Sequence, residues 1–505
     1  MTTDKEEGTG RRRTNRFHAP GDGKQYAIGR GCVSHPLNTP DVPKGMKLTS
    51  LQPQAPASLS SGRKIFNAAF SVAVCSAIAG LVSTAKELVV ARWFGRGDAL
   101  DAFLIAYLLP SFLVNLVAGS FNSAVIPTFI QVREREGDEA AQRLFSGVMV
   151  ISLGLLVGVS ILVGLLAPYF LPLLGSGFSP AKLMLTRQLL YALLPFIALS
   201  GLAVTWTGIL NAGERFGPPA LSLILTPLST MVFLLLLGKR WGVFALVAGT
   251  VVGVALQAAV LGQMLSKRGG RLEPRWHGFD PALRQVIGQY APMLAGALLM
   301  GSTELINQSM AAMLEPGSVA ALNYARKVVS VFIVVGATPL GTAALPYFSQ
   351  MVADGDWSGC RRTLKTYSRS IALMTVPLTL GLVVFSQPLI KIVFQRGAFT
   401  AGDTRVVSHV LVFLSLQIPF YILVILGIRL ISALKRNFVL MVIAGVNMAL
   451  NVILNLILMR YAGVAGIALS TSCVYLVSWV LVYASISRSL ERLDSSEAAH
   501  GKNTP

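Results

Sequence analysis

The sequence predicts an all-α integral membrane protein with about twelve transmembrane helices in two six-helix lobes. The first observation is composition: the 505 residues are 53% apolar and 13% charged, with a mean hydropathy of +0.63. Soluble domains are usually about 25% charged, so soluble enzymes, nucleic-acid binders and secreted scaffolds are disfavoured. The second is a series of long apolar runs, and the third is a motif that recurs once in each half.

Residues 1–63 form the first segment, and their composition differs from that of the rest. They contain Arg11, Arg12, Arg13 and Arg16, many Gly, Pro, Ser and Thr, and no apolar period. Such a segment cannot bury enough apolar surface to fold. We therefore expect a disordered, basic tail on the cytoplasmic side, where it can contact anionic lipid.

The apolar runs extend from Ile65 to about Ser487. Each is long enough to cross a hydrocarbon core of about 30 Å as a helix. In order, they cover residues 65–90, 99–129, 144–171, 184–210, 218–237, 241–265, 284–313, 318–349, 369–390, 406–433, 438–459 and 463–486. They predict an N-lobe of residues 64–268, a C-lobe of residues 269–487 and a cytoplasmic tail of residues 488–505.

Loop charge predicts the orientation. With twelve spans, both termini lie on one side, and that side carries 29 Lys and Arg against 10 on the other. Cytoplasmic loops are enriched in Lys and Arg, so we expect both termini in the cytoplasm.

The two halves share a motif without inversion. Residues 123–129 (SAVIPTF) close the second run, and residues 342–348 (TAALPYF) close the eighth, 219 positions later. This spacing predicts a parallel repeat. Transporters with internal repeats bind substrate between the repeated units and rock around it.

Ionisable residues within the runs are the first candidate site. Such groups cost about 2.5–3.5 kcal/mol each on insertion scales and usually have a function. Lys86 and Glu87 lie near the end of the first run, where they could also snorkel, whereas Glu304, Arg326 and Lys327 lie deeper. Two interpretations stay open: a water-filled cationic cavity for an anionic substrate such as pyrophosphate, or internal ion pairs between Glu304 and a cation of the eighth run.

A second candidate site lies in the eleventh run. Asn447, Asn451 and Asn455 recur every four residues on one helical face. Hydrogen bonding between helices is one interpretation. The other is a monovalent-cation site with amide oxygens as ligands, extended by Glu304 and Thr471.

Motifs of enzyme chemistry are absent from the sequence. It contains no HExxH, no P-loop, and no GxSxG placed between a strand and a helix. We therefore expect a protein that is not an enzyme, that needs no cofactor, and that is driven by Na⁺, by H⁺ or by the membrane potential.

Three stretches resemble the MurJ/MviN-type lipid II flippases of the MOP transporter superfamily. They are residues 86–95 (KELVVARWFG) with Asp101-Ala102-Phe103, residues 209–220 around Asn211-Ala212, and residues 394–404 (FQRGAFTAGDT). The resemblance implies two six-helix lobes in a V shape, often with two extra helices for which this sequence has no room.

The resemblance also implies where a head group binds. At the family's charged positions this chain has Lys86-Glu87 in the first run, Val114-Asn115 in the second and Ala325-Arg326-Lys327 in the eighth. One family carboxylate is replaced by Arg326, and a later family glutamate by Ser330. The cationic set is therefore divergent, which keeps a related oligosaccharide substrate in contention with lipid II.

Together these observations predict a flippase for a polyprenyl-pyrophosphate-linked sugar in the bacterial inner membrane. Peptidoglycan lipid II is the first expectation and an exopolysaccharide or O-antigen unit the second. A cation-coupled drug antiporter of the same superfamily is the alternative class, and a scaffold for a synthase is a third. Expected partners are the lipid-linked sugar, membrane lipids and cell-envelope synthases, and no nucleic acid.

Overall fold

The computed structural model describes residues 58–213, 217–267, 275–276 and 278–500. Most of the predicted tail, up to residue 57, lies outside this range. Within it, all regular elements are helices, as the sequence predicts.

The first helix of the described structure is long and starts seven residues before the first apolar run. The helices before residue 268 are α1 (Ser58–Phe94), α2 (Asp98–Val114), the π-helical segment η1 (Asn115–Gly119), α3 (Ser120–Glu136), α4 (Asp138–Leu174), α5 (Pro180–Ala212), α6 (Gly217–Ser222), α7 (Leu225–Trp241) and α8 (Val243–Ser266).

The remaining helices end within the predicted C-terminal tail. They are α9 (Pro281–Ala311), α10 (Ser318–Ala353), α11 (Trp357–Val384), α12 (Ser386–Phe394), α13 (Ala401–Ser415), α14 (Gln417–Ala433) and α15 (Asn437–His500). Helix α15 contains non-helical backbone at Gly463, with φ 54°, so it is two helices joined at a kink. This kink separates the last two predicted runs.

All twelve predicted runs fall on helices, but several are broken where the sequence pattern is continuous. The run 99–129 contains the π-helical turn η1, and the run 406–433 changes helix at Leu416. Pro110 lies one turn before η1, and Pro419 lies in the first turn of α14. Proline lacks the N–H that an α-helix uses, which gives the change of helix at Leu416 a local cause in Pro419. Nine helical segments in the described range are long and apolar enough to span a membrane. The number of crossings therefore stays a prediction.

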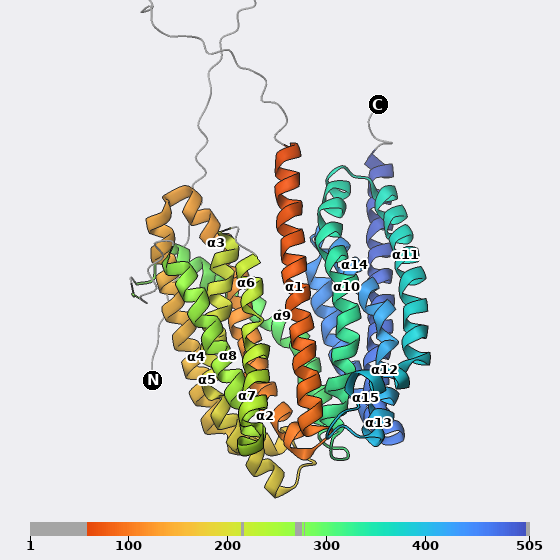
Figure 1. The fold of residues 1–505 in the computed structure, drawn as a ribbon. Coiled ribbons are helices and arrows are strands. Elements are labelled where there is room, and N and C mark those ends of the chain that lie inside the picture. The colour runs from red at the N-terminus through yellow and green to blue at the C-terminus, as the bar shows by residue number, and fades with distance from the viewer. Residues whose placement is uncertain (1–57, 214–216, 268–274, 277, 501–505) are drawn as a thin grey trace, which may run out of the picture. The chain divides into compact units, whose positions relative to one another are not determined.

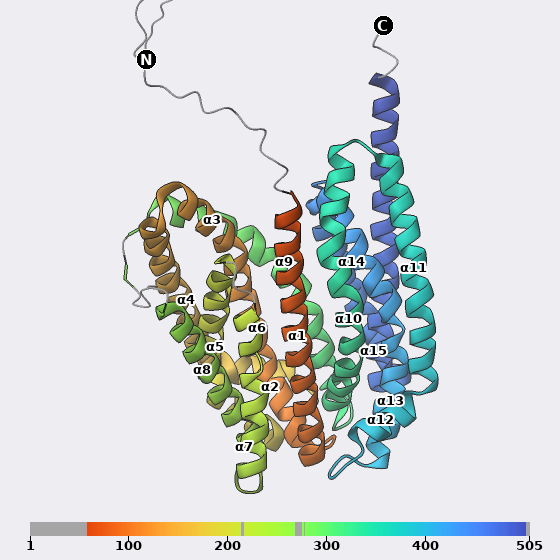
Figure 2. The same ribbon diagram turned by 45° about the horizontal axis from the view of Figure 1, so that its top comes forward.

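The helices pack in two groups (Figure 1). Helices α2, α4, α5, α7 and α8 contact one another, as do α10, α11, α13, α14 and α15. Helix α9 contacts α3 and α15 and so connects the groups. Helix α1 stands between them in both ribbon views, and its last turns bury Val90 and Ala91 (Figures 1 and 2).

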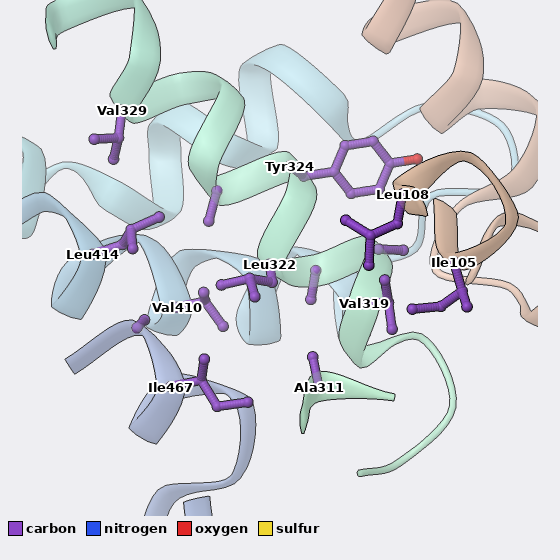
Figure 3. Packing of buried hydrophobic residues seen from close by; sticks show 14 of the residues in the cluster. Ile105, Leu108, Ala311, Val319, Leu322, Tyr324, Val329, Val410, Leu414 and Ile467 are labelled. Atoms are coloured by element: carbon purple, nitrogen blue, oxygen red, sulfur yellow. The ribbon is translucent and has the colours of Figure 1, made fainter. Parts of the chain in front are cut away.

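The first turns of α10 pack within the main hydrophobic cluster (Figure 3). Val319 lies near Ile105 and Leu108 of α2, whereas Leu322 points toward Val410 of α13. All five side chains are buried. Because one helix end packs against both groups, α10 holds them together at this end of the molecule.

Candidate functional site

Charged side chains of α1, α9 and α10 meet in two ion-pair groups. Lys86 Nζ lies 2.8 Å from Glu87 Oε1, and Lys327 Nζ lies 3.9 Å from the same oxygen. Arg326 Nη1 pairs with Glu304 Oε2. Adjacent residues on a helix point about 100° apart, which is why Arg326 reaches α9 while Lys327 reaches α1.

These groups combine features of both interpretations drawn from the sequence. The ion pair of Glu304 with Arg326 forms, and Gln308 Nε2 donates to Glu304 Oε1 over 2.6 Å. Three cations facing two carboxylates nevertheless leave one positive charge. The side chains stay partly accessible, with exposed fractions of 23% for Lys86, 28% for Arg326 and 39% for Lys327. A multivalent anion could compete for these cations without a change of fold.

Asn115 and Ser330 occupy the other two positions that the resemblance marked. Asn115 is exposed, begins the π-helical turn η1 and donates through Nδ2 to the Ser111 carbonyl over 2.9 Å. π-Helical turns are rare and frequently lie at functional sites. Ser330 Oγ donates to the Lys327 carbonyl over 2.8 Å. Neither side chain joins the ion pairs in the described structure.

The asparagine face of α15 forms an amide network with α9. Asn455 Nδ2 donates to Asn307 Oδ1 over 2.7 Å and to Asn451 Oδ1 over 3.3 Å. Asn307 Nδ2 donates in turn to Thr471 Oγ1 over 3.2 Å. Asn447 lies outside this network and donates to Ser478 Oγ over 3.0 Å. The predicted ligands Asn451 and Thr471 are thus brought together, and Asn447 is not.

A monovalent cation at the amide network would need oxygen atoms that are free to coordinate it. Among the described residues nothing donates to the buried oxygens Asn455 Oδ1 and Asn447 Oδ1, of which only the first lies in the network, and the buried nitrogen Asn451 Nδ2 has no acceptor. An orphaned buried acceptor of this kind suits a hard cation. The network itself contains no carboxylate, because Glu304 is engaged by Arg326 and Gln308.

A second arrangement, which we call the loop junction, joins the two groups of helices. It consists of four loops, 95–97, 175–179, 312–317 and 395–400, with the residues that contact them. Arg96 Nε donates to the Gly317 carbonyl over 3.1 Å, and Tyr324 Oη donates to the Gly95 carbonyl over 3.0 Å. Ala398 N donates to the Arg92 carbonyl over 2.9 Å. Two of the stretches that resemble the family, 86–95 and 394–404, therefore meet here.

Asp101 is the buried centre of the loop junction. Its carboxylate accepts from Gly317 N over 2.7 Å and from Ala320 N over 2.8 Å, at the first turn of α10. Helix N-termini favour negative charge because their first N–H groups lack partners within the helix. Lys182 Nζ lies 3.0 Å from Asp101 and 2.6 Å from Asp98, which compensates the buried charge.

Two glycines make reciprocal contacts in the loop junction. A Cβ at Gly397, where φ is +63°, would overlap the main-chain carbonyl of Arg92. A Cβ at Gly177 would overlap the carbonyl of Ala312. Gly177 and Arg92 belong to the first half of the chain, and Gly397 and Ala312 to the second. Each half therefore inserts one glycine loop against the first helical hairpin of the other.

Asn307 and Asp101 are the residues whose structural roles sequence inspection missed. Asn307 lies one turn after Glu304, so its spacing signals the same helical face. Asp101 stands in the first turn of a helix, where an acidic residue is ordinary. Its hydrogen-bond donors are main-chain N–H groups 216 and 219 positions away, and a main-chain N–H cannot be recognised from the residue type.

Comparisons with known proteins agree with this architecture. The family profile described as "Lipid II flippase MurJ" matches residues 90–500. A protein of Synechocystis named "Probable lipid II flippase MurJ" is 29% identical over 387 residues, which cover 72% of this chain and 70% of that protein.

Two solved structures share the fold. A "Lipid II flippase MurJ, inward closed conformation" has a TM-score of 0.73 at 21% identity and covers 84% of this chain and 89% of its own. An inward-facing "multidrug resistance MATE family transporter of the MOP superfamily" has a TM-score of 0.68 at 15% identity, with coverages of 84% and 99%.

Proposed function

This chain belongs to the MurJ family of lipid II flippases, and we propose from this premise that it moves lipid II across the bacterial inner membrane by alternating access. The protein is a multi-pass membrane protein, and the proposal places both termini in the cytoplasm. The observation that supports a phosphate-bearing head group is the convergence of Lys86, Arg326 and Lys327 from α1 and α10, which pair among the described residues with two carboxylates.

Binding is proposed to exchange ion-pair partners. A pyrophosphate carries about two or more negative charges and loses hydration when it leaves water, at a cost that nearby cations offset. Its oxygens would displace Glu304 from Arg326 and Glu87 from Lys327. Because the cations are already paired, they are stable without substrate. Each charge-assisted hydrogen bond contributes roughly 1.5–3 kcal/mol.

The loop junction supports the alternating-access part of the proposal. It holds the helix groups together at the end where α1 meets α2, and the charge pattern of the loops assigns that end to the periplasm. Main-chain hydrogen bonds, the ion pair of Arg96 Nη1 with Asp403 Oδ1 at 3.7 Å, and close glycine contacts can break and reform without unfolding a helix. We propose that this end opens when the head group leaves.

Single neutralisations test the head-group site. We expect Arg326→Gln and Lys327→Gln each to weaken binding about ten-fold to a hundred-fold, since about 1.4 kcal/mol is a factor of ten. Complementation of a depleted host should fail while membrane abundance stays normal. Arg362→Gln changes an exposed cation outside the site and is the matched control. Full activity of both site variants, or a loss that only follows abundance, would show that the charges are structural.

The substrate itself is tested by depletion in the native host. We expect undecaprenyl-pyrophosphate-linked peptidoglycan precursor to accumulate. Accumulation of a different undecaprenyl-linked oligosaccharide would assign the second expected class, an exopolysaccharide or O-antigen unit.

For the coupling ion, we propose that a monovalent cation binds at the amide network of Asn307, Asn451, Asn455 and Thr471. The support is the orphaned oxygen Asn455 Oδ1 among amide and hydroxyl groups. Asn451→Leu should remove Na⁺-dependent stabilisation while the protein still folds, measured as the shift of the unfolding midpoint between NaCl and choline chloride. Asn447→Leu, outside the network, should keep that shift. A wild-type midpoint that is the same in both salts would refute the site.

A further inference from the structure

Helix α12 and the loop 395–400 carry a surface feature that the transport path does not use. A shallow pocket of about 600 Å³ is lined by Pro388, Lys391, Ile392, Gln395 and Arg396. Lys391 and Arg396 are exposed, and the described residues show no ion pair for either. Arg396 Nη2 donates only to the Ile392 carbonyl over 3.1 Å within the described structure. The pocket is therefore cationic and available.

The surroundings of the pocket are apolar on one side. Helix α12 buries Ser386, Ile390 and Phe394, spaced one turn apart, against its neighbours. The opposite face exposes Phe385 by 64% and Ile392 by 69%, and it continues the exposed apolar surface at the end of α11. An apolar strip that leads into a pair of cations is the pattern of a membrane interface, where aromatic and basic side chains anchor at head-group level.

We propose that this pocket binds the phosphate of an anionic phospholipid from the outer leaflet. Lys391 and Arg396 would contact the phosphate, and Phe385, Pro388 and Ile392 would contact the upper part of the acyl chains. The ligand must join an anionic head to an apolar tail, because the pocket offers both surfaces side by side. The pocket lies on α12, and none of its lining residues belongs to the ion pairs of α1, α9 and α10, so a bulk lipid fits it better than the transported substrate.

Such a lipid would act on the loop junction. The same loop that supplies Gln395 and Arg396 bonds to α1 through Ala398 N and the Arg92 carbonyl, 2.9 Å apart. Figures 1 and 2 show α12 at the end of the molecule where α1 turns into α2. A lipid that orders residues 395–396 stabilises residues 397–400 in their contact with the first hairpin. The bound lipid is thus expected to favour the closed junction.

The test compares purified full-length protein in nanodiscs of phosphatidylglycerol and of phosphatidylcholine with matched acyl chains. We expect phosphatidylglycerol to raise the unfolding midpoint of the wild type. Lys391→Gln with Arg396→Gln should abolish most of this rise and weaken phosphatidylglycerol retention in native mass spectrometry by about five-fold per removed charge. Arg405→Gln removes an exposed cation of α13 that does not line the pocket and should behave as the wild type.

Three results would overturn the proposal. If phosphatidylglycerol stabilises the wild type and the double variant equally, it binds outside this pocket. If phosphatidylcholine stabilises the wild type as much as phosphatidylglycerol does, the charge of the lipid has no role. Stabilisation by undecaprenyl phosphate but not by phosphatidylglycerol would instead identify a substrate exit site. None of these readouts depends on transport, so they stand apart from the test of flippase activity.

Discussion

At the scale of single residues, the neighbours Arg326 and Lys327 pair with carboxylates on two different helices. The sequence indicates two adjacent cations in an apolar run, and their energetic cost indicates a function. It cannot indicate that one pairs with α9 and the other with α1, because that depends on helix packing. A pair of Glu304 with a cation of the eighth run was one of the two interpretations, but the pairing of Glu87 with Lys327 was not predicted. The charged side chains of a site can be predicted from the free energy that it costs to place them in a membrane. Which carboxylate each cation contacts depends on how the helices pack.

Asp101 offers the sharpest test at this scale. Asp101→Asn places an NH₂ donor where two main-chain N–H groups donate, and it removes one carboxylate from Lys182. We expect a loss of about 2–4 kcal/mol of unfolding free energy, because a buried group then lacks its partner. Thermal and denaturant unfolding in detergent would measure this loss.

Asp98→Asn is the matched control for that substitution. Asp98 bonds the same lysine, but its side chain is 61% exposed. Exposed ion pairs are worth about 0–1 kcal/mol, so its effect should be small. Equal losses for both variants would mean that Lys182, rather than the cap on α10, dominates the loop junction.

Helices are the elements that the sequence predicts best here, because apolar length and proline positions are local properties. All twelve runs fall on helices, but some boundaries differ widely: α11 starts at Trp357 rather than at 369, and α15 ends at His500 rather than at 486. The break at Gly463 agrees with the gap between the last two predicted runs, whereas the π-helical turn η1 and the short helix α12 were not foreseen. Each depends on how a helix meets its neighbours, which an apolar pattern does not encode.

The glycine of loop 395–400 is a test at the scale of one element. Gly397→Ala forces a left-handed backbone on an alanine and places Cβ against the Arg92 main chain. We expect a loss of about 2 kcal/mol or more, from strain and from overpacking. Gly402→Ala, five residues later at the start of α13, meets only an ordinary contact with Thr400 and should change stability by less than about 1 kcal/mol. A neutral Gly397→Ala variant would contradict the close contact.

At the scale of the whole molecule, the parallel repeat organises the structure. The shared motif predicts it, and the helix starts agree: Ser179 caps α5 and Thr400 caps α13, at similar positions in each half. The lobe boundary near residue 268 and the V shape stay predictions. How the halves contact each other was unpredictable, because loop glycines and carbonyls carry no pattern of their own.

Orientation is the prediction that belongs to this scale. Reporter fusions after Lys64 and in the loop of Arg396 should report opposite sides of the membrane, with the first in the cytoplasm. A fusion in the loop of Lys435 should agree with the first and serves as the control. If the fusions at Lys64 and Arg396 report the same side of the membrane, the twelve-span topology is wrong.

For the proposed opening at the loop junction, the two reciprocal glycine contacts allow a separation in steps. Gly177 against Ala312 and Gly397 against Arg92 are separate contacts, made by different loops. One glycine contact can separate while the other still holds, which yields an intermediate that is open on one side only. Two small barriers in succession are crossed faster than one barrier of their combined height.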